Sequence, residues 1–125
     1  MRAILDSDVL IDYLQGIARA RAEIDLYARR EISIISWMEV LSGAQDEEEK
    51  NAARRFLDSF TVQPLTVEVA SEAVALRRQH RIRLPDAIIW ATARIHGCLL
   101  VTRNTKDFPA RDPGVRFPYV VKGGG

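Results

Sequence analysis

The 125-residue sequence contains very little cysteine and histidine, and this scarcity excludes several kinds of chemistry. Cys98 is the one cysteine, so the chain has no internal disulfide, which favours a reducing compartment. The two histidines, His80 and His96, fall at expected helix ends, where capping or surface roles are commoner than catalysis. The sequence therefore offers no set of cysteines and histidines for a zinc site.

Long hydrophobic runs and a large net charge are also missing. No stretch approaches the ~18 apolar residues that a membrane helix needs, and the amino terminus lacks a signal peptide's basic region and apolar core. We therefore expect a cytoplasmic protein that contacts no membrane. The net charge of +1 does not indicate nucleic acid, although 15 of the 18 basic residues are arginines, which suit phosphate. Arginine-rich codon usage explains this bias at least as well.

The residues that are present fit one globular α/β domain. Hydrophobic residues make up 47% and charged residues 28%, which is typical of a folded chain rather than a disordered one. Short apolar runs predict strands at 2–5, 32–35, 61–65 and 98–101, with two helices between successive strands and an edge strand at 115–117. This order predicts a three-layer α/β/α sandwich with a mainly parallel central sheet. We expect a single domain over residues 1–122 and a flexible glycine tail at 123–125.

Acidic and hydroxyl side chains come where the predicted strands end and helices begin. They are Asp6 and Asp8 after the first strand, Ser36 and Glu39 after the second, Asp86 at a later helix start, and Thr102, Asn104 and Asp107 after the fourth strand. Parallel strands share one rim at their carboxyl ends, so these side chains are expected to converge. Converging carboxylates repel one another unless a cation intervenes, and an all-oxygen set suits Mg²⁺ or Mn²⁺.

Each of these residues also has an ordinary structural explanation. Ser7 or Asp8 can cap the first helix, and Ser36 with Glu39 matches a capping box that starts at Ser36. An acid such as Asp86 stabilises the first turn of a helix without any function. The joint placement of the acids, rather than any single one, indicates a site. A divalent ion held there would support phosphodiester hydrolysis without a serine, cysteine or histidine nucleophile.

Four blocks in order carry a family resemblance: Leu5-Asp6-Ser7-Asp8-Val9-Leu10-Ile11-Asp12, Ser36-x-x-Glu39-Val40-x-x-Gly43, Leu84-Pro85-Asp86-Ala87-Ile88-Ile89-x-Ala91-x-Ala93 and Leu100-Val101-Thr102-x-Asn104-x-x-Asp107-Phe108. The chain resembles the PIN-domain ribonucleases, and most of all the compact VapC-type toxins of toxin–antitoxin pairs. The resemblance implies a Mg²⁺- or Mn²⁺-dependent endoribonuclease that cleaves RNA, forms a homodimer and is covered at its active site by a cognate antitoxin.

The resemblance also implies roles for individual residues. Asp6, Glu39 and Asp86 match the three principal metal-binding acids, and either Asn104 or Asp107 completes the catalytic set. Residues that would orient these acids or the phosphate without binding metal are Ser7, Asp8, Ser36 and Thr102. Arg103 is the arginine nearest in sequence to this rim and is a candidate for contact with an RNA phosphate.

Two alternatives remain at this point. The Asp6-Ser7-Asp8 run also fits a haloacid-dehalogenase-like phosphatase, in which Asp6 would be the nucleophile and Asp8 the general acid. The chain is short for that fold and lacks the lysine that precedes its late acidic pair. The second alternative is a PIN-like domain that binds RNA or a protein through a degraded metal site. Asn104, where many relatives place an aspartate, is the only hint of it.

Overall fold

The computed structural model describes residues 2–121, so the expected glycine tail lies outside the described residues. Five strands are present: β1 (Arg2–Leu5), β2 (Arg29–Ser33), β3 (Thr61–Gln63), β4 (Leu99–Val101) and β5 (Val115–Arg116). The same residues, 2–121, contain six helices: α1 (Ser7–Leu14), α2 (Ala18–Asp25), α3 (Ile34–Ser42), α4 (Glu47–Leu57), α5 (Val67–His80) and α6 (Leu84–Ile95). In this part of the chain no helix combines the length and the apolar character that crossing a membrane requires.

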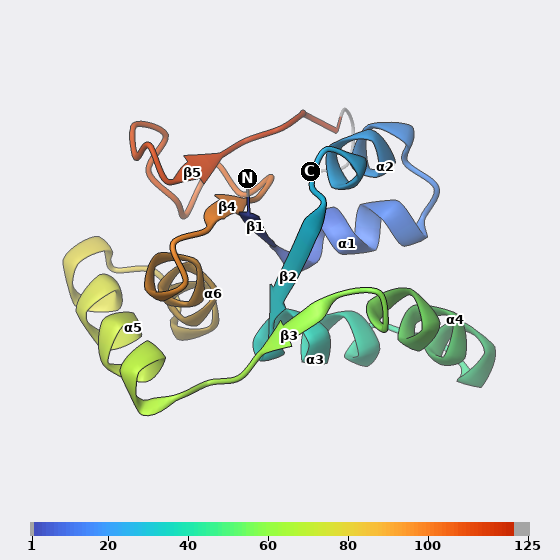
Figure 1. Ribbon diagram of the computed structural model, residues 1–125, viewed down its shortest axis with the longest axis horizontal. Helices are drawn as coiled ribbons and strands as arrows, with labels where there is room; N and C mark the ends of the chain where they lie inside the picture. The colour runs from blue at the N-terminus through green and yellow to red at the C-terminus, as the bar shows by residue number, and fades with distance from the viewer. Residues whose placement is uncertain (1, 122–125) are drawn as a thin grey trace.

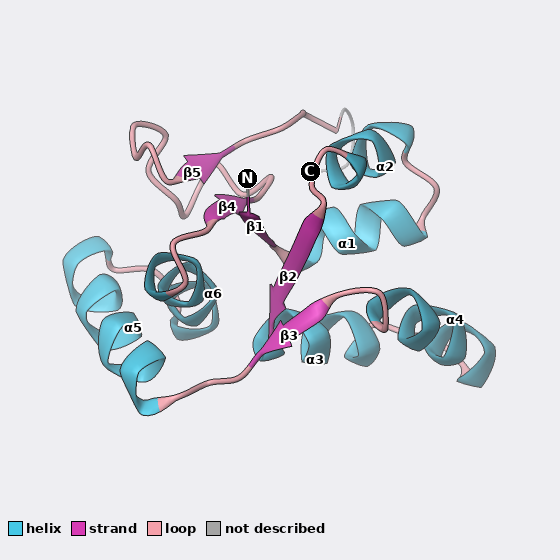
Figure 2. Ribbon diagram, in the orientation of Figure 1, coloured by secondary structure: helices cyan, strands magenta, loops and turns pink. Residues whose placement is uncertain are grey.

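The strands form one parallel sheet in the order β3-β2-β1-β4-β5. The chain moves outward from β1 to β2 and β3, and then crosses back to β4 on the other side of β1. Because crossovers between parallel strands are right-handed, this reversal places α1–α4 on one face of the sheet and α5 and α6 on the other. Figures 1 and 2 show these layers. The predicted three-layer α/β/α fold with a parallel sheet is confirmed.

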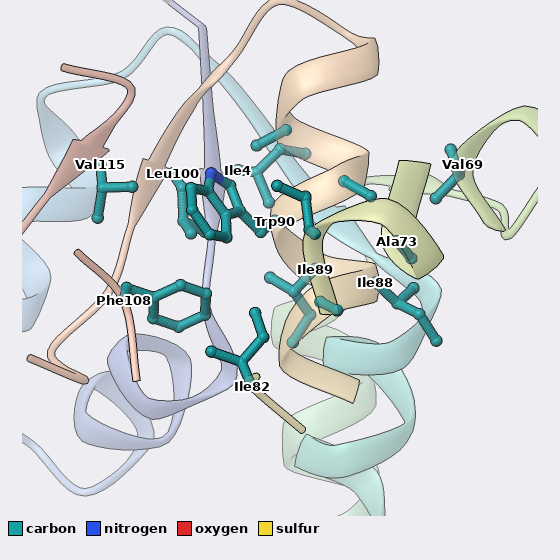
Figure 3. Close-up of a cluster of buried hydrophobic side chains, with 14 of the residues drawn as sticks. Ile4, Val69, Ala73, Ile82, Ile88, Ile89, Trp90, Leu100, Phe108 and Val115 are labelled. Carbon is teal, nitrogen blue, oxygen red and sulfur yellow. The ribbon is translucent and has the colours of Figure 1, made fainter. Parts of the chain in front are cut away.

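Each face of the sheet has its own hydrophobic core. Beneath α5 and α6, Trp90 is 1% exposed and meets Phe108 edge-on, with ring centroids 5.8 Å apart, beside Ile4 and Leu100 of the sheet (Figure 3). The other core lies beneath α1–α4 and includes Leu5 and side chains from all four helices. The nearly all-apolar sequence of α6 is explained within one chain, since α6 packs between the sheet and α5.

Two expected helix starts are wrong. The N-cap of α1 is Asp6, whose side chain accepts a hydrogen bond from the Ser7 amide, and not Ser7 or Asp8. The N-cap of α3 is Ser33, whose hydroxyl accepts from the Ile35 amide at 3.0 Å, and not Ser36. The isoleucines at 34 and 35 suggested strand because they are β-branched, yet they form the first turn of α3.

Candidate active site

The winding of the sheet reverses between β1 and β4, and the carboxyl ends of these two strands define the β1–β4 crevice that this topology predicts. These two strands are neighbours, and the connections that follow them run in opposite directions, which is where open α/β sheets bind ligands. Asp6 follows β1 and Thr102 follows β4. The Asp6 amide donates to the Val101 carbonyl at 2.9 Å, and the Thr102 hydroxyl donates to Asp6 Oδ2 at 2.7 Å. The first and last blocks of the sequence therefore meet at this point.

Ser7 connects this crevice to α3. Asp6 is 4% exposed, and its Oδ1 accepts the Ser7 amide at 2.7 Å. The Ser7 hydroxyl donates to Glu39 Oε1 at 2.9 Å and lies 3.4 Å from Asp6 Oδ1. Glu39 lies in the second turn of α3, because that helix begins at Ile34. Glu39 therefore cannot form a capping box at the start of α3. Its carboxylate instead accepts the Ser7 hydroxyl on the Asp6 side of the crevice.

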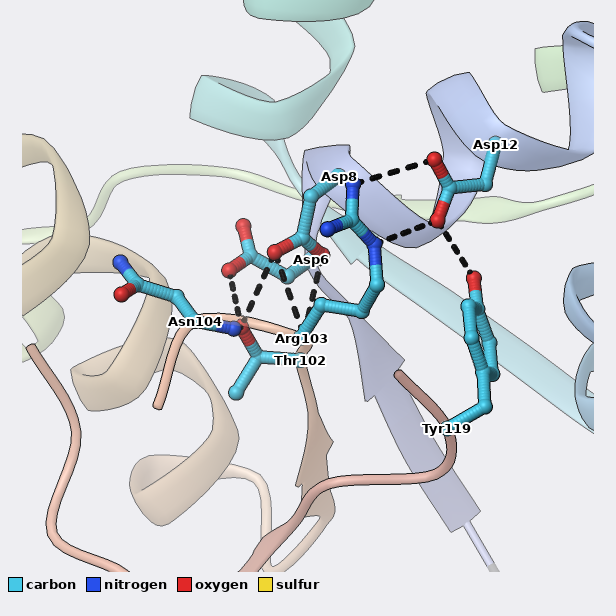
Figure 4. A network of polar contacts seen from close by, with 7 residues as sticks. All are labelled: Asp6, Asp8, Asp12, Thr102, Arg103, Asn104 and Tyr119. Atoms are coloured by element: carbon cyan, nitrogen blue, oxygen red, sulfur yellow. Dashed lines mark hydrogen bonds and ion pairs between the residues drawn. The ribbon is translucent and has the colours of Figure 1, made fainter. Parts of the chain in front are cut away.

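Asp8 lies on the same side of α1 as the loop after β4 (Figure 4). Its two carboxylate oxygens accept the Arg103 amide at 3.3 and 3.1 Å, and Oδ2 is 3.4 Å from the Thr102 hydroxyl. Burial and the nearby Asp8 charge raise the pKa of Asp6 above its usual range. Burial likewise raises the pKa of Asp8. Asp6 and Asp8 are therefore buried close together although their negative charges repel each other.

Asp86 enters the crevice from the first turn of α6, where it is 6% exposed. Arg83 Nε lies 3.4 Å from its Oδ2, but that arginine side chain is largely exposed. Burial raises the pKa of Asp86, Arg83 opposes the shift, and the charges of Asp107 and Glu39 add to it. Asp86 thus lies in the field of acids from α3 and from the loop after β4, as the convergence argument expected.

Asn104 and Asp107 form a closed turn. The Asn104 side-chain amide donates to Asp107 Oδ2 at 2.9 Å, and the Asp107 amide donates to Asn104 Oδ1 at 3.1 Å. Both polar atoms of the Asn104 side chain are therefore used within the turn. Asp107 keeps its second carboxylate oxygen, and its charge is felt at Asp86. This geometry favours Asp107 over Asn104 as the fourth carboxylate position.

Arg103 does not extend freely from the rim. Its Nε and Nη2 contact Asp12 Oδ2 and Oδ1 at 2.5 and 3.1 Å, and Tyr119 donates its hydroxyl to the same Oδ2 at 2.8 Å (Figure 4). This pairing does not favour the expected phosphate contact. Sequence reasoning gave no role to Asp12 or Tyr119. Asp12 had a usable signal, since it follows Asp8 by four residues on one helix face. The position of Tyr119 had none.

Ser36 was expected to support the acids, and the structure gives it no such contact. Its side chain is fully buried, and its hydroxyl has no hydrogen-bond partner among residues 2–121. Ser7, Asp8 and Thr102, the other supporting residues, all contact Asp6, Glu39 or each other.

The donor chemistry of the site fits a hard divalent cation. Within residues 2–121, no three Asp, Glu, His or Cys side chains are already arranged around one point as a metal-binding group. The converging side chains of Asp6, Asp8, Glu39, Asp86 and Asp107 nevertheless offer carboxylate oxygen alone, which Mg²⁺ and Mn²⁺ prefer. Burial, and then the charges of neighbouring acids, raise the pKa values of Asp6 and Asp86, and a cation would favour their charged forms.

The parallel α/β/α fold with acids at its β1–β4 crevice defines the class of protein. The family model described as "PIN domain" matches residues 3–112, and the chain belongs to the PIN-domain family. Ribonuclease VapC10 of Mycobacterium tuberculosis is 35% identical to it over 129 residues, covering 96% of this chain and 95% of that protein.

Solved structures give the same result. A chain of the "Toxin-antitoxin complex from Klebsiella pneumoniae" is 40% identical, with a TM-score of 0.89, over 95% of this chain and 99% of that one. A chain of the DNA-bound VapBC from Salmonella typhimurium is 22% identical, with a TM-score of 0.73, over 93% and 96% of the two chains. The second likeness supports the fold alone.

Proposed function

We propose that this PIN-domain protein is an endoribonuclease that hydrolyses RNA phosphodiester bonds and acts as the toxin of a toxin–antitoxin pair. The observation that carries the proposal is the hydrogen bond between Thr102 and Asp6 at the β1–β4 crevice, with Glu39 reached through Ser7 and Asp86 buried nearby. The similarity to a protein named as a ribonuclease and to a chain of a toxin–antitoxin complex supports it.

The proposal includes a Mg²⁺ or Mn²⁺ ion as cofactor. Asp6, Glu39 and Asp86 would hold it, and Asp107 would contribute a fourth carboxylate near Asp86. When bound, such an ion lowers the pKa of water and neutralises charge that develops on the phosphate. The three principal acids come from β1–α1, α3 and α6, so the sheet and both helical layers fix the distances between them.

The remaining polar residues orient the acids. Thr102 and the Ser7 amide each hold one oxygen of Asp6, and the Ser7 hydroxyl holds one oxygen of Glu39. Asp86 accepts only the 3.4 Å contact from Arg83 among the described residues, so its lone pairs are the least engaged of the three acids. Burial raises the pKa of Asp86, which makes its carboxylate a better proton acceptor, and Asp86 is our candidate to accept a proton from attacking water.

The other functions considered for the sequence have less support. A phosphatase of the haloacid-dehalogenase type would need a lysine ahead of a late acidic pair, which this sequence lacks, and the chain belongs to the PIN-domain family. A degraded binding module was suggested by Asn104 alone. Asn104 completes a turn with Asp107, so the asparagine has a structural role and leaves the other acids in place.

The proposed partners are an RNA substrate, a cognate antitoxin and a second copy of the chain. The antitoxin is checked by co-purification with the product of a small neighbouring reading frame, which should abolish RNA cleavage when bound. The homodimer is checked by the mass of the isolated protein in solution. A monomeric mass at micromolar concentration would exclude a stable homodimer.

Replacing Asp6 with asparagine tests the enzymatic assignment. We expect Asp6→Asn to lower metal-dependent RNA cleavage by more than about a hundredfold, because even residues that merely support metal ligands cost about 10–100-fold. Asparagine caps helices as well as aspartate does, so α1 and the melting temperature should be preserved. The matched control is Asp46→Asn at the exposed N-cap of α4, which should leave cleavage unchanged. Full activity in Asp6→Asn would exclude a nuclease at this site.

A further inference from the structure

A second polar network lies beside the proposed active site and is not explained by metal binding. It consists of Asp12 in α1, Arg103 in the loop after β4, and Tyr119 in the carboxy-terminal segment (Figure 4). We propose that these three residues form a clamp that positions the loop after β4, and with it Asp6 and Asp8, for the reaction. The inference rests on the proposed function and makes Arg103 a positioning residue rather than a phosphate contact.

The clamp acts on the catalytic acids through two consecutive loop residues. Asp8 and Asp12 are one helical turn apart, so both face the loop. Arg103 contacts the first with its backbone amide and the second with its guanidinium group. The preceding residue, Thr102, holds Asp6 through its hydroxyl. Any shift of Arg103 along α1 therefore also moves the donor that orients Asp6.

Burial makes this pairing hard to break. The Asp12 side chain is 4% exposed and the Arg103 side chain 24% exposed. A buried carboxylate needs charged or hydrogen-bonding partners, and a bidentate arginine contact is among the strongest available. If Arg103 turned to an RNA phosphate, Asp12 would keep only the Tyr119 hydroxyl. The structure therefore opposes a substrate role for this arginine.

The carboxy-terminal segment contacts both Asp12 of the clamp and the loop that the clamp positions. Tyr119 donates to Asp12, and the Arg116 carbonyl accepts the Thr102 amide at 3.1 Å, so the loop is fixed through a side chain and through the backbone. Tyr119 lies beyond residues 3–112, the part of the chain that matches the PIN-domain model. A residue outside the matched region thus supports the site inside it.

The chain contains a closely matched control network. Glu23 in α2 is also buried, accepts a bidentate contact from Arg116 at 2.7 and 2.9 Å, and receives the Tyr27 hydroxyl at 2.7 Å. It has the same acid, arginine and tyrosine composition. It reaches the loop at 102–107 only through the backbone bond from the Thr102 amide to the Arg116 carbonyl, which extends the β4–β5 ladder and does not involve the Glu23 side chain. Glu23→Gln should therefore lose stability as Asp12→Asn does, without the effect on the site.

The first test separates positioning from substrate binding. We expect Asp12→Asn to lower kcat for RNA cleavage by about 10–100-fold with KM within about twofold, and to weaken Mn²⁺ binding measured by calorimetry. Arg103→Ala should have the same effect, and the double variant should be no worse than either single one. Tyr119→Phe should lower kcat severalfold, and Glu23→Gln should leave kcat within about twofold of the wild type.

Two outcomes would overturn the clamp. A raised KM in Arg103→Ala, with kcat and KM of Asp12→Asn equal to those of the wild type, would make Arg103 a phosphate contact. An equal kcat loss in Glu23→Gln would overturn it as well, because the effect would then come from lost stability.

The second test does not depend on any activity. The amides of Arg103 and Asn104 donate to Asp8 and to the Thr102 hydroxyl, so the clamp should protect both from hydrogen exchange. We expect their exchange to accelerate at least about tenfold in Asp12→Asn and to remain unchanged in Glu23→Gln. If the wild-type protein cleaves no RNA, the proposed function fails while this experiment still decides the clamp. Unchanged exchange in Asp12→Asn would overturn it.

Discussion

Asp6 shows how one residue serves both the fold and the site. Its backbone is extended, with φ −70° and ψ 155°, which lets Oδ1 turn back to cap α1 at the Ser7 amide. The same conformation directs Oδ2 across the crevice to Thr102. The structural and functional explanations of this aspartate are therefore compatible, because each uses a different oxygen of one carboxylate.

Replacing Asp86 and Asn104 in turn tests which of these two residues contributes more to RNA cleavage. We expect Asp86→Ala to lower RNA cleavage by more than about a hundredfold, because it removes a buried carboxylate on which the charges of Asp107 and Glu39 act. Asn104→Ala should cost much less, since its amide only holds Asp107 in a turn. Cleavage rates and Mn²⁺ affinity, measured side by side, check this order. The reverse order would mean that the amide of Asn104, and not Asp107, completes the site.

Local sequence predicted the acids at this rim and several residues that support them, but it gave no role to Asp12 or Tyr119. Asp6, Glu39 and Asp86 stand where strands end or helices begin, and parallel topology alone implied that they would converge. Tyr119 could not be found in this way, because its contact with Asp12 depends on how the carboxy-terminal segment runs past α1. Such a path is set by tertiary packing and leaves no periodic pattern in the sequence.

At the scale of elements, the start of α3 decides what Glu39 can do. A capping box beginning at Ser36 would have used the Glu39 carboxylate to bind its own helix terminus. The actual start at Ile34, capped by Ser33, moves Glu39 into the second turn and frees it to accept the Ser7 hydroxyl. Sequence could not settle this register, because serines at 33 and 36 both precede helix-compatible residues and the isoleucines between them favour strand as well.

The two serines give opposite expectations for stability. Ser33→Ala removes the cap of α3 and should lower the free energy of unfolding by about 1–2 kcal/mol. Ser36→Ala removes a buried hydroxyl that has no partner in residues 2–121, and it should be neutral or stabilising by up to about 1 kcal/mol. Urea unfolding of both variants measures the difference. A larger loss in Ser36→Ala would restore Ser36 as the cap.

At the scale of the whole molecule, buried acids lie in two kinds of surroundings. The carboxyl end of the sheet gathers carboxylates whose pKa values are raised. The middle of β2 holds another buried acid, Glu31, which is surrounded by hydrogen-bond donors. Arg2 of β1 contacts both of its oxygens at 2.6 and 2.8 Å, and Gln63 of β3 donates at 2.7 Å. Glu31 therefore joins three strands of the sheet.

This arrangement predicts the acid sensitivity of the fold. The Arg2 hydrogen bonds lower the pKa of Glu31 from 4.5 to about 2, while burial opposes the shift. Because the folded-state pKa is below the unfolded one, the stabilisation is complete above about pH 4.5 and is lost as the pH falls through 2. This difference in the pKa of Glu31 between the unfolded and folded states corresponds to about 3 kcal/mol.

Glu31→Gln should therefore lower the free energy of unfolding by about 3 kcal/mol at pH 7. The loss should be much smaller near pH 2, because the wild type has there lost most of the stabilisation that charged Glu31 provides. The matched control is Asp25→Asn, which breaks the more exposed 3.5 Å pair with Arg30 and should cost less than about 1 kcal/mol at any pH. Denaturant titrations between pH 2 and 7 measure both variants. A constant difference between wild type and Glu31→Gln across this range would mean that packing, and not the charge of Glu31, joins these three strands.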